Sequence, residues 1–256
     1  MKVFKTFFIF LFAFLLVSCT HSPYTNRKQL ILVSPAQELQ MGYKAEQDIL
    51  RKSNINRDPR LNAMVRRVGQ NIAKVANQPN YQWSFHVING KEINAFCLPG
   101  GKVFVYTGLL NIVDNESQLA TVMAHEVAHA IARHGAERIS MMQLGDLGRK
   151  LAIKAVGAKY QNVINQVYGI SANYGVFLPY SRSFEYEADE IGLYLMAKAG
   201  YDPREAIKFW EKMMQATRNM KKPPEFASTH PSDINRIRRL QTLLPRAMQY
   251  YNQSRR

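Results

Sequence analysis

Residues 121–135 read TVMAHEVAHAIARHG, and within this stretch His125, Glu126 and His129 form the pattern His-Glu-x-x-His. The surrounding apolar residues recur at helical spacing, so we predict a helix with both histidines one turn apart on the same face. Both imidazoles can then reach one metal ion at about 2.0 to 2.1 Å. Glu126 projects beside that face, where it can accept a proton from water at the metal. An ordinary pair of helix-surface histidines is the alternative, but the flanking methionine and alanines would bury this face.

The limits of this helix and the source of a third ligand depend on neighbouring residues. Asn115, with a glutamine three positions later, can cap a helix that runs through residues 120–133 and ends at Gly135. At about 100° per residue, His134 would point to the face opposite His125 and serve as a C-terminal residue of the helix. The third ligand must therefore come from another part of the chain.

A downstream segment supplies candidates for that ligand. The sequence SRSFEYEAD, residues 181–189, carries Glu185 and Asp189 four positions apart, which places both carboxylates on one helix face. One carboxylate could bind a metal while the other orients a ligand histidine through its free N–H group. Glu187 lies about 200° round the helix and should face away from the metal. Taken alone, the segment could also be a solvated acidic helix face.

The pattern along the rest of the chain predicts an α+β fold class. Strands are predicted where apolar and polar residues alternate, and helices where apolar residues recur at helical spacing. The predicted strands cover residues 83–88, 93–98 and 103–106, and the predicted helices cover 36–50, 61–76, 136–168, 183–200, a segment after Pro203, and 231–244. We therefore expect one mostly helical domain with a small antiparallel sheet. Residues 146–180 indicate no particular role.

The first residues of the chain are typical of a secretory signal peptide. Lys2 and Lys5 precede an unbroken apolar run over residues 7–17, which is too short to cross a bilayer of about 30 Å. We assign residues 1–18 to this signal peptide.

The end of this segment predicts a lipid anchor. Leu-Val-Ser-Cys, ending at Cys19, resembles the bacterial lipobox, in which the cysteine is lipidated after cleavage. Residues 19–35 would then form a lipidated N-terminus and tether, and residues 36–256 the catalytic domain. Because Thr20 follows the cysteine instead of aspartate, the expected location is the bacterial cell envelope, at the periplasmic face of the outer membrane.

Three motifs in the same order, HEVAHAIARH, SRSFEYEAD and HPSDINRI, resemble the gluzincin metallopeptidase family that includes the CAAX prenyl endopeptidases and the heat-shock membrane protease. Within that family the chain most resembles bacterial periplasmic lipoprotein metalloproteases. The resemblance implies a zincin-like metalloprotease domain with its small sheet at the cleft. It also implies one zinc ion held by His125, His129 and Glu185, with Glu126 as catalytic base and Asp189 beside a ligand histidine.

The same resemblance suggests roles for three further residues. Asn94 precedes a strand expected at the edge of the cleft, where it could bind a substrate carbonyl or amide, or simply form a turn. His230 could stabilise the oxyanion or occupy the open metal position in a resting state, although a histidine before proline could also just belong to a helix cap. Arg236 would anchor the same loop. Cys97 is expected in the core.

We expect a membrane-anchored zinc endopeptidase that cleaves misfolded or misassembled envelope proteins. The alternative is a non-proteolytic or dual-role chaperone that assists an outer-membrane protein assembly machinery. Two histidines with a glutamate favour zinc over cobalt or manganese, although ligand type alone does not separate them.

The net charge of +15 adds little to this expectation. Residues 81–202, which carry the metal motifs, have a net charge of −1, so the basic excess lies in the flanking segments. These flanks could face an anionic membrane surface beside the anchor, or simply be solvated. Because basic and aromatic residues are not regularly interleaved, nucleic acid is not an expected partner.

Overall fold

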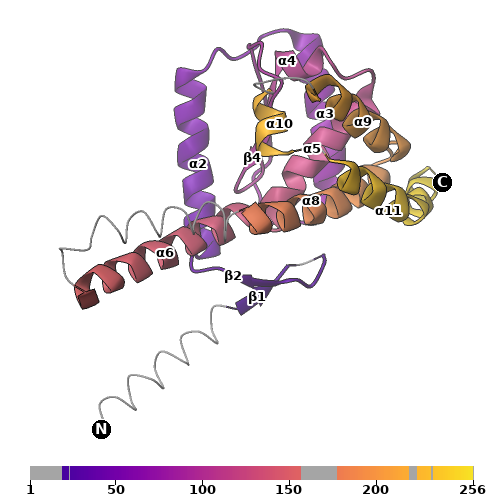
Figure 1. The fold of residues 1–256 in the computed structure, drawn as a ribbon. Coiled ribbons are helices and arrows are strands. Elements are labelled where there is room, and N and C mark those ends of the chain that lie inside the picture. Colours follow the sequence, from indigo (N-terminus) through magenta and orange to yellow (C-terminus); the bar gives the residue numbers. More distant parts are fainter. Residues whose placement is uncertain (1–18, 23, 157–177, 219–223, 232, 256) are drawn as a thin grey trace.

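Helix α5, Glu116–Ile131, lies at the centre of the molecule and packs against α8, Leu178–Lys198 (Figure 1). The computed structural model describes residues 19–22, 24–156, 178–218, 224–231 and 233–255. Nearly all of α5 is buried, which explains why its sequence is apolar on several sides. The predicted cap is confirmed, because the Asn115 side chain accepts a hydrogen bond of 3.0 Å from the backbone N–H of Gln118.

A three-stranded sheet lies beside α5. It consists of β3, Ser84–Ile88, β4, Ala95–Leu98, and β5, Lys102–Tyr106, in the order β3-β5-β4. β4 pairs antiparallel with β5, whereas β3 pairs parallel with it, so the sheet is mixed rather than wholly antiparallel. The α+β class is confirmed. The parallel pair arises because β4 occupies the edge of β5 that lies next to α5 and leaves the other edge to β3.

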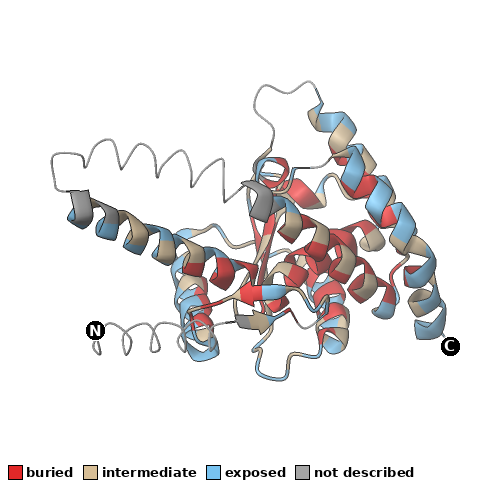
Figure 2. Cartoon of the chain, turned by 60° about the horizontal axis from the view of Figure 1, so that its bottom comes forward, coloured by how far each residue is buried: buried red, intermediate tan, exposed pale blue. Residues whose placement is uncertain are grey.

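Further helices cover this centre. α3, Pro59–Ala76, packs against β3 and α5, while α9, Arg204–Thr217, and α11, Ile234–Ser254, pack against α5 and α8 respectively. Two short helices, α4, Thr107–Leu110, and α10, Glu225–Thr229, lie in the connections. Figure 2 shows the buried residues concentrated in the middle of the molecule, with α11 exposed along its outer side.

Helix α6, His134–Val156, projects from the body of the protein (Figure 1). The described residues of its outer half are exposed or half-buried, and residues 157–177, which include most of the stretch without a predicted role, lie outside the described residues. In the part of the chain that the structure describes, no helix has both the length and the apolar character needed to span a membrane.

The N-terminal residues contact the domain. β1, Cys19–His21, and β2, Lys28–Leu30, form an antiparallel hairpin. After it, Ile31 and Val33 are buried against Ala136 of α6. Part of the predicted tether is therefore folded onto the domain. The predicted signal peptide, residues 1–18, lies outside the described residues, and lipidation of Cys19 stays a prediction.

Helix α2, Pro35–Lys52, runs along one side of the molecule and contacts the sheet near the β4–β5 turn (Figure 1). Its Gly42 lies against the backbone of Pro99, and a Cβ atom at position 42 would come within 1.9 Å of the Pro99 carbonyl oxygen. Because backbone atoms cannot yield as a flexible side chain can, α2 needs glycine at this contact.

We expect the substitution Gly42→Ala to lower the free energy of unfolding by about 1–3 kcal/mol, because the added methyl group separates α2 from the turn. Denaturant-induced unfolding measures this loss. Gly145→Ala is the matched control: Gly145 lies in α6, where an added Cβ atom would meet open space within 4 Å, so alanine should stabilise by about 0.5–1 kcal/mol. Equal effects of the two substitutions would contradict the proposed contact.

Candidate metal centre and its cleft

Helix α5 presents His125 and His129 on one face, as the sequence spacing predicts. Their Nε2 atoms lie 3.1 Å apart, and the planes of the two rings are steeply inclined to each other. His125 is buried, and His129 is partly exposed to the cleft. The two nitrogens thus converge on one point at the surface of the helix.

Helix α8 brings a carboxylate to the same point. Glu185 Oε2 lies 3.2 Å from His125 Nε2, and Glu185 Oε1 lies 3.3 Å from His129 Nε2. Gly192 permits this approach, because a Cβ atom there would lie only 3.0 Å from the backbone nitrogen of His125. The close crossing of α8 and α5 therefore sets the position of the carboxylate relative to the histidines.

The residues at this point fit a zinc ion. One ligand atom from each of His125, His129, Glu185 and His230 can be chosen so that all four lie within 4.8 Å of one another. Neighbouring nitrogens in a tetrahedral zinc centre with Zn–N bonds of about 2.0–2.1 Å are about 3.3 Å apart, close to the separations seen here. Imidazole nitrogens and a carboxylate that converge in a buried place are also the donor set that zinc prefers.

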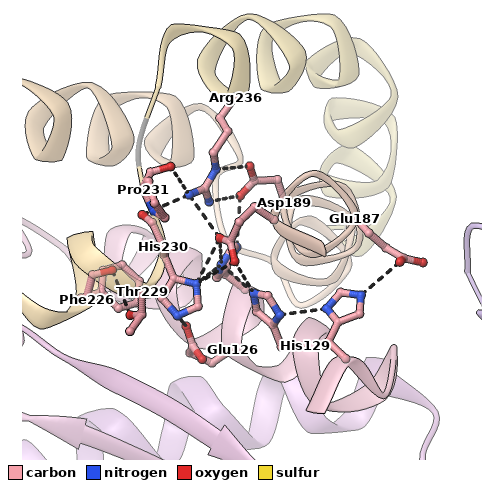
Figure 3. Close-up of polar contacts among 12 residues, drawn as sticks. Glu126, His129, Glu187, Asp189, Phe226, Thr229, His230, Pro231 and Arg236 are labelled. Atoms are coloured by element: carbon pink, nitrogen blue, oxygen red, sulfur yellow. Dashed lines mark hydrogen bonds and ion pairs between the residues drawn. The ribbon is translucent and has the colours of Figure 1, made fainter. Parts of the chain in front are cut away.

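His230 lies within the ligand set rather than at its margin. Its Nδ1 atom is 3.2 Å from His125 Nε2 and 3.1 Å from both carboxylate oxygens of Glu185, and its Nε2 atom is 3.3 Å from Glu126 Oε1 (Figure 3). Four protein ligands are typical of a closed structural zinc site, whereas catalytic sites keep one position open. The geometry therefore suits the predicted resting-state role better than a simple helix cap.

We expect His230→Ala to change the rate of peptide hydrolysis without changing zinc content, because His125, His129 and Glu185 still supply three ligands. Removing a ring from the open position should raise the initial rate if His230 occupies that position at rest, and lower it if the ring stabilises the oxyanion. Metal analysis and initial rates on the same preparation measure both. Loss of stoichiometric zinc in the variant would contradict this expectation.

Asp189 contacts His125 on the side away from the metal position, and Arg236 holds Asp189 in place. Asp189 Oδ1 lies 3.1 Å from His125 Nδ1, and Arg236 donates two hydrogen bonds of 2.7 Å to the Asp189 carboxylate. Arg236 also donates to the backbone carbonyls of His230 and Pro231, which fixes the loop before α11 (Figure 3). The structure thus places both residues where the sequence analysis expected them.

The surroundings shift the pKa values of these groups. Burial alone would lower the pKa of His125, but Asp189 and Glu185 outweigh it and raise that pKa to about 9. Burial lowers the pKa of His129 to about 4, so its ring is neutral near pH 7, whereas His125 must release a proton when a metal ion binds. Burial also raises the pKa of Glu126. A carboxylate with a raised pKa is a better proton acceptor near neutral pH.

A cavity of about 390 Å³ opens beside His129 and His230, with the edge strand β4 along one side. Asn94 lines this cavity at the start of β4, where its backbone carbonyl accepts a hydrogen bond from Tyr106. Its predicted role in substrate binding stays a prediction. Cys97 packs against the core as expected, and burial raises the pKa of its thiol.

His134 does not lie where the sequence analysis placed it. Its Nδ1 atom is 2.8 Å from Nδ1 of His129, and its Nε2 atom is 3.0 Å from Glu187 Oε2. The prediction of the opposite face was wrong because α5 ends at Ile131 and Arg133 adopts a left-handed conformation with φ of 58°. The turn carries His134, now the first residue of α6, back beside His129.

A helix that carries His-Glu-x-x-His, joined by a glutamate from a second helix and backed by an aspartate, defines a zinc metallopeptidase of the gluzincin type. The chain matches Peptidase family M48 over residues 59–244 and belongs to that family. The family assignment made from the three sequence motifs is thereby confirmed.

Individual relatives agree with the family. The chain is 38% identical over 228 residues to Mitochondrial metalloendopeptidase OMA1 of Schizosaccharomyces pombe, covering 88% of this chain and 66% of the relative. It is 38% identical over 173 residues to the human Metalloendopeptidase OMA1, mitochondrial, and the match covers 65% of this chain and 33% of the relative. It is 31% identical over 212 residues to the Beta-barrel assembly-enhancing protease of Escherichia coli K12, and the match covers 80% of this chain and 43% of the relative. The chain thus spans about a third to two thirds of the length of these relatives.

These comparisons correct the predicted location. Similar proteins of fungi, animals and plants are named mitochondrial metalloendopeptidases, and several of them are more similar to this chain than the Escherichia coli protease is. The predicted location in a bacterial cell envelope, at the periplasmic face of the outer membrane, was therefore wrong, whereas lipidation of Cys19 stays a prediction. The predicted location gave too much weight to a four-residue motif at the end of a short apolar run.

Proposed function

We propose that this protein is a zinc-dependent endopeptidase that hydrolyses peptide bonds of unfolded or misassembled proteins at a membrane. The convergence of His125, His129 and Glu185 beside Glu126 is the observation that carries the proposal. A structural zinc site has no use for an additional buried carboxylate beside its ligands. Zinc bound by the three ligands would polarise the scissile carbonyl and lower the pKa of a water molecule toward about 7.

The chain's own residues would perform the remaining work. Glu126 would accept the proton of the attacking water at its Oε1 atom and then deliver it to the nitrogen of the leaving amine. The edge strand β4 would pair with an extended substrate backbone, which gives affinity with little demand on side-chain identity. Such recognition suits unfolded proteins, since a segment must be extended to add to a sheet edge.

Membrane attachment forms part of the same proposal. A lipid attached to Cys19, where the folded hairpin begins, would hold the domain close to a lipid surface. The basic flanking segments of the chain favour an anionic surface.

We expect a metal chelator to abolish degradation of an unfolded protein such as reduced, carboxymethylated casein, and added Zn²⁺ to restore it. The measurement is the rate of peptide release before chelation, after chelation and after metal is returned. Metal analysis of the untreated protein should give one zinc per chain. Degradation that a chelator leaves unchanged would refute the proposed chemistry.

A second candidate function is suggested by the name of the Escherichia coli relative, which describes a protease that enhances β-barrel assembly. The chain could combine proteolysis with help to assembling membrane proteins. In an assembly assay, a Glu126→Gln variant that still assists would support this second function, and one that fails would leave proteolysis as the source of any effect.

A further inference from the structure

The turn between β1 and β2 reaches a carboxylate on α8. Arg27 Nε donates a hydrogen bond of 2.6 Å to Glu187 Oε2, and the Thr25 hydroxyl donates to Glu187 Oε1. Glu187 is only 4% exposed, so its charge is compensated almost wholly by protein groups. A segment that the sequence suggested as a tether thus supplies the partners of a buried carboxylate in the catalytic domain.

The same arginine, Arg27, also forms hydrogen bonds with a glutamate near the start of α6. Its Nη1 and Nη2 atoms donate hydrogen bonds of 3.0 and 2.7 Å to the two oxygens of Glu137, whose side chain is fully buried. Gln29 adds a hydrogen bond of 2.5 Å to the backbone carbonyl of Ala132, in the turn between α5 and α6. The hairpin is therefore attached to α8, to α6 and to the turn that places His134.

From Glu187 the contacts continue to the metal site. His134 Nε2 lies 3.0 Å from Glu187, and His134 Nδ1 lies 2.8 Å from His129 Nδ1, while His129 Nε2 faces the metal position (Figure 3). His134 also stacks on Phe184, with ring centroids 4.3 Å apart. The imidazole between carboxylate and ligand is thus held at both nitrogens and on one ring face.

The direction of these hydrogen bonds follows from the chemistry of imidazole. A histidine that binds zinc through Nε2 carries its proton on Nδ1, so His129 must donate to Nδ1 of His134. His134 must then carry its own proton on Nε2, where it donates to Glu187. Each bond needs the next, because a different tautomer of His134 would place two N–H groups against each other.

The two ligand histidines of α5 are therefore supported differently. His125 has a carboxylate, Asp189, directly at its Nδ1 atom, whereas His129 reaches the carboxylate of Glu187 only through His134. This indirect contact can hold the His129 ring in place only if the Glu187 carboxylate is itself fixed. Thr25 and Arg27 fix this carboxylate.

We propose that Arg27, Glu187 and His134 are positioning residues for the zinc ligand His129, so that docking of the N-terminal hairpin determines how tightly the site binds metal. This inference rests on the proposed zinc endopeptidase function. The β1–β2 hairpin would then help to position a zinc ligand, in addition to linking the domain to the predicted lipid anchor.

The test compares the zinc affinity of the full chain with that of five variants, of which three remove contacts between the hairpin and His129. His134→Phe keeps the stacking on Phe184 but removes both hydrogen bonds, Arg27→Met removes the charge that holds Glu187, and Thr25→Val removes one hydroxyl at nearly constant shape. Competition with a chelating dye measures the dissociation constant for zinc. The visible absorption spectrum of the Co²⁺-substituted protein reports the geometry of the ligands independently of activity.

We expect zinc to bind about 10–100-fold more weakly to His134→Phe and about 10-fold more weakly to Arg27→Met, with altered Co²⁺ spectra in both. Thr25→Val should also weaken zinc binding and alter the Co²⁺ spectrum. Arg27→Lys should restore part of the affinity, since lysine keeps the charge but cannot bind both carboxylates as a fork.

Arg67→Met is the matched control, because Arg67 pairs with Glu116 at the other end of α5 and is far more exposed. Its zinc affinity and Co²⁺ spectrum should equal those of the wild type. Wild-type affinity and spectra in Thr25→Val and Arg27→Met would overturn the inference while leaving the proposed function intact. A wild-type protein that neither binds zinc nor degrades casein would instead refute the proposed function, and the inference with it.

Discussion

Replacing Glu126 with glutamine is expected to lower the rate of peptide hydrolysis by about 10²–10⁴-fold, the usual contribution of a positioned acid–base group. Glutamine has the shape of glutamate but cannot accept the proton of the attacking water. Because Glu126 is not among the converging ligand atoms, zinc content should remain that of the wild type. Rates of casein degradation and metal analysis on the same samples measure the two effects.

The same substitution should not destabilise the fold. Glu126 is 4% exposed, and among the described residues its Oε1 atom accepts no hydrogen bond and has only an ionic contact of 3.3 Å with His230 Nε2. Burial outweighs this contact and raises the pKa of Glu126, so its carboxylate is costly to bury. A neutral side chain there should give an equal or higher free energy of unfolding, as is common where activity needs a strained group. Glu116→Gln, at the half-buried start of the same helix, is the control and should leave hydrolysis unchanged. Wild-type hydrolysis by Glu126→Gln would refute the role assigned to this residue.

Replacing Arg236 with methionine is expected to lower the free energy of unfolding by about 3–5 kcal/mol, the cost of breaking one partner from a buried ion pair. Arg236 and Asp189 are each 1% exposed at their side chains, so water cannot replace the lost guanidinium. The loop that carries His230 would lose its two hydrogen bonds from Arg236 as well. Denaturant-induced unfolding measures the difference.

The effect should depend on pH in a definite direction. Burial would raise the pKa of Asp189, but Arg236 outweighs it and lowers that pKa below its usual value. The pair therefore stabilises the protein at neutral pH, and this contribution fades as the pH falls through the lowered pKa. The difference between wild type and Arg236→Met should shrink in acid.

Arg239→Met provides the matched control, because Arg239 makes an exposed pair with Glu190 on the same two helices. Its cost should stay below about 1 kcal/mol. A cost for Arg236→Met as small as that of Arg239→Met would show that the buried pair does not stabilise the fold.

Local patterns made much of the metal site predictable. The spacing of His125 and His129 and the capping side chain of Asn115 act within one helix, and the spacing of Glu185 and Asp189 does the same within another. Such short-range geometry is encoded in neighbouring residues. The structure brings these groups together because two helices with one functional face each must bury that face against each other.

Features that depend on distant contacts were not predictable in the same way. The left-handed turn at Arg133, which is stabilised by bonds from its side chain to Glu38 and Val33, changed the direction of His134. The parallel pairing of β3 with β5 likewise depends on which edge β4 occupies. A clue to the hairpin contact existed, since Glu187 is an acidic residue on a largely buried helix, but its partner at Arg27 is remote in the sequence.

The distribution of the ligands over the chain has a consequence for biosynthesis. The residues that converge on the metal come from α5, from α8 and from the loop before α11, so they meet only after most of the chain has been made. Contacts between such distant segments are slow to form because the loops between them must close first. A nascent or partly folded copy therefore has no assembled metal centre, so the proposed peptidase would gain its activity only after the chain has folded.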